Sequence, residues 1–473
     1  MEIIDPMFAD LSKSPIKDDS VIYDQYVKVP LLANASAIST ATQLKWQVSD
    51  RSSWYDYSRA YIIVNVQVAR SFNPTVGLTA TDSVAFASSG WNLFRRPRLT
   101  YGGQLLHADS KDLIGSLVNI TSLLEYSEDY TRAGASMSGF YPDTGTGATI
   151  TSPLVLGAGS AATAVANSAD VMTALALATN FSYNQEQFNE GFARRAAAVA
   201  AVPFNVGVGN TVSFVLPLRE AFGFLKHNHF AMKGEVLDFT IDVESSKSRA
   251  LQATAGSNAN IVWQLTSAEM WVPIVKPALA LELYLTQQTA AGAKNIITYK
   301  DWSIFALTGH ASTSIQYTPA NVKDPQRVVF AMSDALAEST QTVSPSIYPN
   351  FSLTDLVFKL NGRSYPENRI QPDFANKLYG RAYHDMLELF GKSNPNIGFD
   401  HGSIINYKRF GDLYSLFCAD ISKRDSSLNN VGEMLRLDVE GTVAATAKTL
   451  LVLVECDRQL VLEGSGTGIK TIP

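Results

Sequence analysis

The chain has 473 residues, more than the roughly 250–300 at which one hydrophobic core stops growing, so we expect two large domains. Apolar residues make up 46% of it and charged residues only 17%, which excludes a disordered chain and suits a surface largely covered by other copies. The net charge is −6 and basic runs are as short as Arg95-Arg96-Pro97-Arg98, so strong direct binding of nucleic acid is disfavoured.

The two cysteines and the N-terminal residues indicate the cellular compartment in which the chain folds. Cys418 and Cys456 are too few for a disulfide framework or a zinc module, so we expect buried thiols in a reducing compartment rather than a disulfide between the two. The N-terminal sequence MEIID lacks the basic and apolar regions of a signal peptide, and no apolar run reaches the ~18 residues of a membrane span. We therefore expect a soluble chain without a secretion signal.

Alternation of apolar and polar residues predicts β-strands along the whole chain. The clearest runs are residues 62–68, 237–244 and 435–440. Because each such strand has one buried and one solvated face, we expect antiparallel sheets. Further strands are expected at residues 21–31, 44–48, 212–216, 261–275, 279–285, 296–307, 327–332, 413–421 and 450–462.

Helices are expected mainly at residues 111–126 and 374–390, where apolar residues recur at helical spacing. Each follows a strand–Gly–strand pattern, at Gly103 and at Gly362, and each precedes a Gly-Glu pair that opens a strand, at Gly234 and at Gly432. Two landmarks in the same order around a single helix indicate a duplicated fold with two similar halves.

The first half is longer than the second. The landmarks are 61 residues further apart in it, and an Ala/Gly-rich stretch at about 133–200, with a helix expected at 189–199, has close to that length. Long segments with little core of their own project from a scaffold, so we interpret this stretch as a surface insertion. The predicted organisation is an N-terminal arm at 1–20, a first half at 21–255 and a second half at 256–473 that ends in a short flexible tail.

Several segments in order carry a resemblance to a known family. They are VIYDQY at 21–26, LKWQV at 44–48, SWYDYS at 53–58 before the strand at 61–68, the strand pair from Leu93-Phe94 to Gly102-Gly103, LLEYS at 123–127, and the closing strands at 450–462 with ECDR at 455–458. Together, over nearly the whole chain, they resemble the double jelly-roll, adenovirus hexon-like major capsid proteins, especially of the Polinton/Maverick, adintovirus and virophage branch. The Ala/Gly-rich insertion departs from the family pattern.

The resemblance implies an all-β, mainly antiparallel fold of two tandem eight-stranded jelly rolls, each with one helix in a loop. It also implies a non-enzymatic major capsid protein that trimerises into pseudo-hexameric capsomers, which tile an icosahedral shell around a double-stranded DNA genome. The expected partners are the homotrimer, neighbouring capsomers, and penton, minor capsid or cement proteins. The expected location is the virion, after assembly inside the host cell. The length and composition of the insertion lead us to expect it on the outer face of the shell.

Possible chemical sites are each better explained as structure. His227-Asn228-His229 offers two imidazoles without a third ligand, and an apolar strand follows where an HNH nuclease needs a metal-binding hairpin and helix. The glycine-rich runs at 207–210 and 464–468 lack the strand–loop–helix order of a phosphate loop. Tyr383-His384-Asp385 comes without a nucleophile elbow and is interpreted as a helix surface.

The remaining polar and aromatic groups give no site either. Asp19 with Asp24, and Asp425 with Asp438, lack the spacing of a calcium loop. The aromatic cluster Trp54, Tyr55 and Tyr57 is predicted to anchor a sandwich or an interface rather than to bind a sugar. We therefore nominate no catalytic, cofactor-binding or metal-binding residue. The alternative function is a β-sandwich carbohydrate-binding or adhesion protein, followed by a jelly-roll hydrolase.

Overall fold

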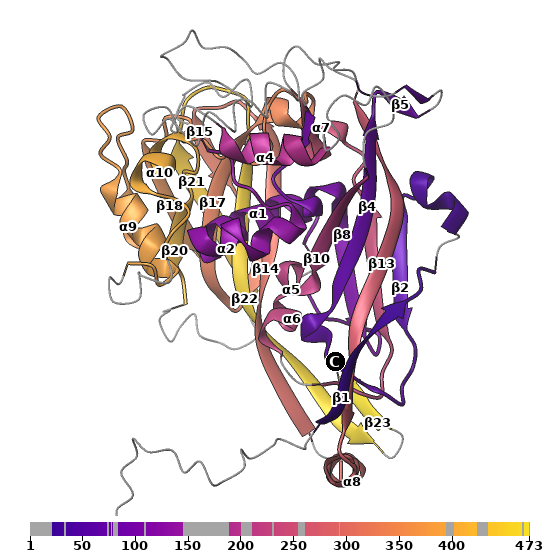
Figure 1. Ribbon diagram of the computed structural model, residues 1–473. Helices are drawn as coiled ribbons and strands as arrows, with labels where there is room; N and C mark the ends of the chain where they lie inside the picture. The colour runs from indigo at the N-terminus through magenta and orange to yellow at the C-terminus, as the bar shows by residue number, and fades with distance from the viewer. Residues whose placement is uncertain are drawn as a thin grey trace, which may run out of the picture.

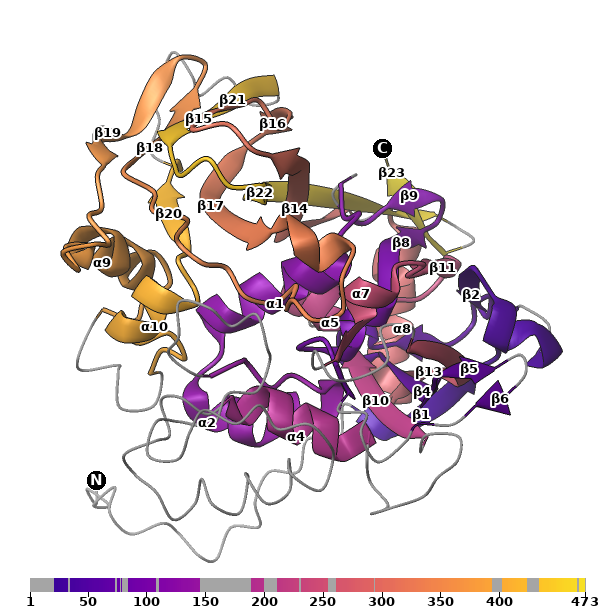
Figure 2. The same cartoon turned by 90° about the horizontal axis from the view of Figure 1, so that it is seen from above.

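In the computed structural model, two antiparallel β-sandwiches stand side by side (Figures 1 and 2). The structure describes residues 21–32, 35–72, 75–76, 78, 84–107, 110–144, 189–199, 211–228, 231–253, 261–292, 294–393, 402–422, 434–465 and 468–472. The predicted N-terminal arm and most of the predicted insertion lie outside these residues. Among the described residues, no helix has the length and apolarity needed to cross a membrane.

The first sandwich is built from eight main strands in two sheets. One sheet has the order β1 (Val21–Val29), β13 (Val262–Pro277), β4 (Tyr61–Ala69), β10 (Val212–Pro217), and the other has the order β2 (Gln43–Val48), β11 (Leu237–Val243), β8 (Phe94–Tyr101), β9 (Gln104–Leu105). Counted along the chain from one to eight, these strands are ordered 1-8-3-6 and 2-7-4-5. This pairing of two Greek keys is a jelly roll.

The second sandwich repeats the same order. Its sheets are β14 (Lys294–His310), β22 (Lys448–Ser465), β17 (Pro325–Asp334), β20 (Phe417–Asp420), and β15 (Ser314–Tyr317), β21 (Met434–Thr442), β18 (Asp355–Leu360), β19 (Arg363–Ile370). Numbered in the same way, the strands again run 1-8-3-6 and 2-7-4-5. The prediction of two tandem eight-stranded jelly rolls is therefore confirmed.

Short strands extend these sheets or form small ribbons. They are β3 (Trp54–Tyr55) beside β13, β16 (Asn321–Lys323) beside β21, β23 (Gly468–Ile472) beside β22, the pair β7 (Val84–Phe86) and β12 (Leu251–Ala253), and the pair β5 (Ser71–Phe72) and β6 (Thr75–Val76). The strand β23 stands where the sequence predicted a flexible tail, and that part of the prediction is wrong. Its residues form backbone pairs with β22, from Val461 opposite Ile472 onward.

The border between the halves differs from the predicted 255/256. Strand β13 lies between β1 and β4, with Met270 opposite both Val29 and Ile62, so the first jelly roll continues to Pro277. The turn-forming residues at 254–260 resemble a linker in the sequence. In a jelly roll, however, the eighth strand returns to pair between the first and the third, and this long-range pairing sets the border.

The two predicted main helices are confirmed and occupy equivalent places. Helix α1 (Ile114–Glu125) lies between β9 and β10, and α9 (Gly380–Leu389) lies between β19 and β20, so both connect the fifth strand to the sixth. The helix predicted at 189–199 is present as α4 (Glu190–Val199). Further short helices are α2 (Glu128–Arg132), α5 (Leu218–Ala221), α6 (Gly223–His227), α7 (Lys247–Ala250) and α10 (Tyr407–Asp412), besides the 3₁₀ turns η1 (Ala35–Thr40), η2 (Tyr57–Arg59), η3 (Gly90–Leu93), η4 (Gly134–Ser138) and η5 (Ala335–Glu338).

One predicted strand is a helix. Residues 279–285 read LALELYL, whose leucines alternate as in a strand, but they open α8 (Leu279–Ala290) between the two jelly rolls. Alanine, leucine and glutamate favour helix, and among the described residues this segment pairs with no strand. Local propensity therefore decides its structure.

The Gly landmark of each half is a two-residue hairpin turn. Gly102 and Gly103 join β8 to β9 with φ of 57° and 82°, and Asn361 and Gly362 join β18 to β19 with φ of 48° and 84°. Two positive φ values define the turn whose twist matches that of the paired strands, and only glycine adopts them freely. The same geometric need in both halves explains the repeated sequence pattern.

We expect Gly362→Ala to lower the free energy of unfolding by about 1 kcal/mol, because a left-handed backbone costs an L-residue roughly 1–2 kcal/mol. The space beside Gly362 is open, so the loss would measure backbone strain alone. Urea titration of the purified protein measures it. Gly402→Ala is the matched control, because Gly402 is equally open and has no left-handed φ, and an equal loss in both variants would contradict the explanation.

Candidate functional site

The junction between the two jelly rolls is the most elaborate polar region of the described structure. Helix α1 lies there, between the second jelly roll and helix α5 of the first (Figure 2). Almost every residue of α1 is buried, from Ile114 to Leu124, as expected for a helix enclosed on all sides. Three polar clusters around it connect the halves.

The first cluster centres on the ammonium group of Lys111, just before α1. Its Nζ donates to Asp301 Oδ1 at 3.0 Å and to the carbonyl oxygens of Trp302 at 2.7 Å and Ala221 at 3.1 Å, which occupies all three N–H donors. Asp301 also accepts from the backbone N–H of Gly223 at 2.9 Å. The side chains of Lys111 and Asp301 are 1% and 0% exposed. Burial lowers the pKa of Lys111, and the charge of Asp301 opposes that shift.

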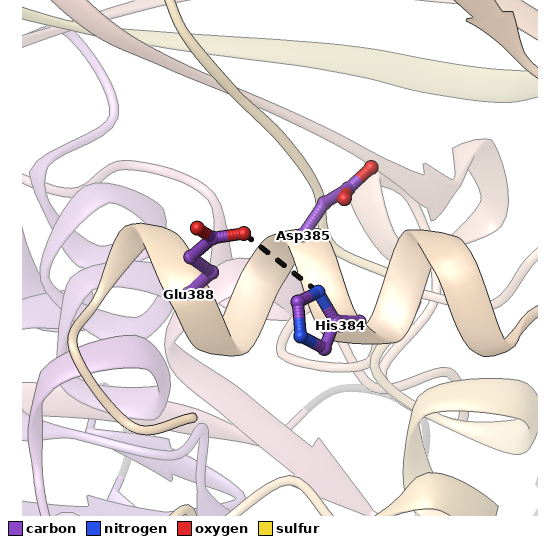
Figure 3. Close-up of side chains that lie close together, drawn as sticks. All are labelled: His384, Asp385 and Glu388. Carbon is purple, nitrogen blue, oxygen red and sulfur yellow. Dashed lines mark ion pairs between the residues drawn. The ribbon is translucent and has the colours of Figure 1, made fainter. Parts of the chain in front are cut away.

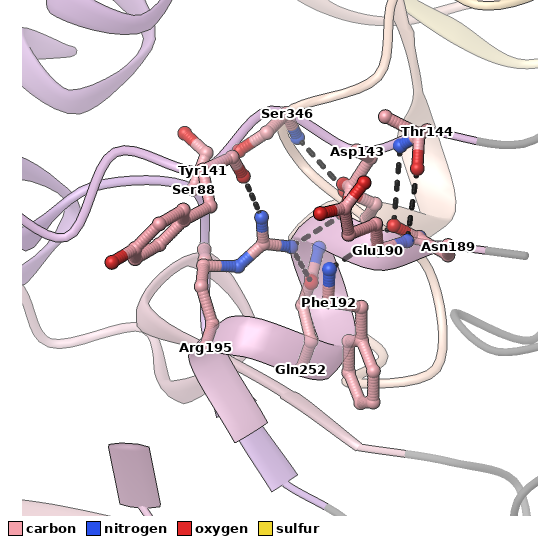
Figure 4. A network of polar contacts seen from close by, with 12 residues as sticks. Ser88, Tyr141, Asp143, Thr144, Asn189, Glu190, Phe192, Arg195, Gln252 and Ser346 are labelled. Carbon is pink, nitrogen blue, oxygen red and sulfur yellow. Dashed lines mark hydrogen bonds and ion pairs between the residues drawn. The ribbon is translucent and has the colours of Figure 1, made fainter. Parts of the chain in front are cut away.

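The second cluster centres on the guanidinium group of Arg195 in α4 (Figure 4). Arg195 donates to Asp143 Oδ1 at 2.5 Å, to Gln252 Oε1 at 3.1 Å, and to the carbonyl oxygens of Phe86 and Tyr141. The side chains of Arg195 and Asp143 are 2% and 0% exposed. Four acceptors from three segments of the chain thus satisfy one buried cation.

The same Asp143 reaches the second jelly roll. Its Oδ2 accepts from Ser344 Oγ at 2.9 Å, and its backbone oxygen accepts from the hydroxyl of Tyr414 at 2.7 Å. Burial raises the pKa of Tyr414 far above its usual range, so this hydroxyl remains a donor. Asp143 therefore links α4, at the end of the insertion, to two segments of the other half.

The third cluster centres on Asn119 of α1. Its Nδ2 donates to the Tyr348 hydroxyl at 2.9 Å and to the Ser346 carbonyl oxygen at 3.3 Å, and its Oδ1 accepts from Ser88 Oγ at 2.7 Å. Asn119 is 1% exposed and Tyr348 is fully buried. A polar group this deeply buried is stable only while its partners stay in place, so the contact fixes α1 against the second jelly roll.

The ends of the insertion are also joined. The backbone N–H of Thr144 donates to Asn189 Oδ1 at 3.2 Å, and the backbone N–H of Glu190 donates to Thr144 Oγ1 at 2.8 Å (Figure 4). The chain therefore leaves and re-enters the scaffold at one point. Residues 145–188, between these ends, lie outside the described residues.

The residues weighed as chemical sites are not brought together into one. His227 ends α6, with its Nδ1 at 2.9 Å from the carbonyl oxygen of Gly223, while His229 lies outside the described residues. The glycine run at 207–210 also lies outside them, and that at 464–468 joins β22 to β23.

His384, Asp385 and Glu388 form the one group of three metal-ligand types that the described residues bring close together (Figure 3). They lie on the solvent side of α9, with His384 Nδ1 at 3.7 Å from Glu388 Oε2. Their ligand atoms all lie within 4.8 Å of one another, but His384 and Glu388 are exposed, and exposed acidic groups are common without a metal ion. Asp385 also pairs with Arg381 at 3.8 Å. We assign no metal to this group.

The carboxylates considered for calcium are separate. Asp24 pairs with Arg59 at 2.5 Å, and Asp438 pairs with Arg436 at 2.9 Å. Asp19 and Asp425 lie outside the described residues.

The aromatic cluster and the cysteines lie in the sandwiches. Tyr55 and Tyr57 are buried and stacked with ring centres 5.6 Å apart, and Tyr57 meets Tyr101 edge-on at 6.2 Å, which is a packing role. Cys418 and Cys456 are buried free thiols on β20 and β22, with β17 between these strands. Burial raises the pKa of Cys456 to about 12 and that of Cys418 further.

Comparisons with known proteins find similar folds among solved structures. No family model matches the chain, and no curated protein matches it in sequence. Among solved structures, that of the Sputnik virophage is similar at a TM-score of 0.60 with 12% identity, over 100% of this chain and 92% of that one. The PBCV-1 virus capsid gives 0.52 with 9% identity, over 98% and 99%. The Faustovirus major capsid protein gives 0.50 with 9% identity, over 96% and 92%. The chain is thus a double jelly-roll protein in fold.

We expect Lys111→Met to lower the free energy of unfolding by about 3–5 kcal/mol, because it leaves the charge of Asp301 buried without its partner. Urea titration followed by tryptophan fluorescence measures the loss. Adding Asp301→Leu to this variant should recover part of it. Lys28→Met is the control, since Lys28 forms an exposed pair with Glu269 and should cost less than about 1 kcal/mol. Equal losses at both lysines would contradict the structural role.

Proposed function

We propose that this chain is a major capsid protein whose trimers form pseudo-hexameric capsomers that tile an icosahedral shell around a double-stranded DNA genome. The observation that carries the proposal is the pair of jelly rolls with identical strand order in one chain. Three such chains around a closed threefold axis present six similar sandwiches, which approximate a hexagon. A hexagonal outline lets identical units cover a surface.

The junction supports this role mechanically. A capsid subunit must keep a constant angle between its two sandwiches, because neighbouring subunits contact both sandwiches. Lys111, Asp143 and Asn119 each find partners in the second jelly roll only in one relative placement of the halves. Any hinge motion would leave buried polar groups unpaired, which costs several kcal/mol for a charged group.

The proposal includes a place and partners. The protein acts in the virion without catalysis, beside neighbouring capsomers and penton, minor capsid or cement proteins. Its likeness in fold to the PBCV-1 virus capsid and the Faustovirus major capsid protein supports a role in a shell. The net charge is −6, and most described acidic groups are paired with basic ones. Both features are more typical of a shell subunit than of a protein that binds nucleic acid.

Size-exclusion chromatography with light scattering tests the proposal. The purified protein should elute at three times the 51.4 kDa of the chain, or larger, at micromolar concentration. An obligate interface above ~2,000 Å² per contact is expected to hold such a trimer together. Negative-stain images should show pseudo-hexagonal particles, whereas a stable monomer would rule the trimeric capsomer out.

The insertion gives a further test. The described ends of the stretch at about 133–200 are buried at the junction, as at Asp143 and Arg195. Because these ends are joined at one point of the scaffold, we expect the part between Thr144 and Asn189 to lie on the outer face of the shell. Limited proteolysis of intact particles should cut within this stretch before it cuts the sandwiches. Full protection of the stretch in particles, with cleavage in the dissociated chain, would contradict an outer location.

A further inference from the structure

Helix α8, the link between the jelly rolls, is apolar and uncovered. Leu279, Leu283 and Tyr284 are 69%, 55% and 57% exposed, and none of its residues whose side chains the structure describes is buried. Its one charged residue, Glu282, pairs with Lys233 at 3.3 Å. The first seven residues of α8 are apolar except for Glu282, and an apolar surface of this kind is normally enclosed by protein. Among the described residues, nothing buries it.

Strand β1 lies at the same end of the molecule and is also uncovered (Figure 1). Among the described residues, it pairs with β13 on one side and with no strand along its other edge. Val21, Ile22, Tyr26 and Val27 are between 37% and 61% exposed, on both faces of the strand. An open edge with apolar side chains is a template for adding another chain, which monomeric proteins avoid.

The helix and the strand form one surface, which we call the base patch: Val21, Ile22, Tyr26 and Val27 of β1 and Leu279, Leu283 and Tyr284 of α8. Val21 pairs with Pro277, two positions before Leu279, so the start of the strand lies beside the start of the helix. The base patch lies at the opposite end of the molecule from α4, where the insertion re-enters (Figure 1).

Charge helps to identify what covers the base patch. Helices that lie on anionic lipid carry lysine or arginine on their polar face, and α8 has neither. The charged groups nearby are already paired within the chain, Asp24 with Arg59, Lys28 with Glu269 and Lys294 with Glu463. The described residues thus give this surface no unpaired charge that would select a distant charged partner. It fits an apolar, neutral protein surface that is present at high local concentration.

We propose that the base patch is a contact with a second copy of this chain in the assembled capsomer. This inference rests on the proposed function, which places copies of the chain next to one another. Tyr284 and Leu283 are its anchors, since aromatic and large apolar side chains dominate the binding energy of such contacts. The open edge of β1 supplies the backbone donors and acceptors beside them.

The first experiment compares the assembly of three proteins by light scattering over a dilution series. The variant Leu283→Ser/Tyr284→Ser should raise the concentration of half-dissociation about 30-fold or more relative to wild type, the size expected on losing a central anchor. The control Leu378→Ser/Met434→Ser removes two residues that are 66% and 64% exposed in the second jelly roll, and should shift it less than about twofold. Equal melting temperatures of the three proteins exclude misfolding.

The second experiment reads the contact directly. Tyr284→Cys introduces an accessible thiol into a chain whose two native cysteines are buried. Alkylation of the introduced thiol should be at least tenfold slower in the assembled protein than in the diluted, dissociated chain. Equal rates in the two states would overturn the proposal.

The outcomes separate this inference from the proposed function. A wild-type protein that stays monomeric defeats the capsomer proposal itself. A wild type that assembles while Leu283→Ser/Tyr284→Ser assembles equally well keeps the capsomer and overturns the base patch as a contact between copies. Flotation with phosphatidylserine vesicles is run in parallel. Flotation of the wild type but not of the variant, with assembly unchanged, would assign the patch to a membrane and would also overturn it.

Discussion

The arrangement of the molecule depends on a buried ammonium group. Lys111 belongs to the first jelly roll, two of its three acceptors belong to β14 of the second, and almost none of the pair is exposed to water. A buried charge is tolerated only when its geometry is fully satisfied. The two jelly rolls therefore have one low-energy placement, and the clusters around Arg195 and Asn119 impose the same placement from other directions. Rigidity here comes from polar groups that have no alternative partners, in addition to the continuous apolar core.

Local patterns in the sequence predict most of the fold. The alternating runs become β4, β11 and β21, the two main helices occupy equivalent connections, and the repeated glycines become hairpin turns with positive φ. These features succeed because each is determined by neighbouring residues. The errors have two causes. Residues 279–285 alternate like a strand, but their composition favours the helix that they form. The border at 255/256 is wrong because β13 pairs with β4, roughly 200 positions earlier in the chain.

The junction residues are beyond prediction from one sequence for the same reason. Lys111 and Asp301 are 190 positions apart, and Ser344 lies 201 positions from Asp143. Before folding, nothing near Lys111 distinguishes it from a lysine on a helix surface. One signal does exist: the segment that follows Asp112 is a long, almost uncharged helix, and a helix of that kind is enclosed on all sides. A charge at its entrance then needs a buried partner, although the sequence does not say which acid provides it.

The two ends of the molecule differ in a way that suits a subunit of a capsid shell. At one end, an insertion leaves and re-enters at a point closed by Thr144 and Asn189, so that segment can vary in length without disturbing the sandwiches. At the other end, α8 and β1 expose apolar side chains and a strand edge that no other described residue pairs with, while the described charges near them are paired within the chain. An exposed edge is a hazard for a free monomer and an advantage for a subunit that is always next to its neighbours. Because the buried contacts of the junction hold the two jelly rolls in one placement, the two different ends keep fixed positions relative to both jelly rolls.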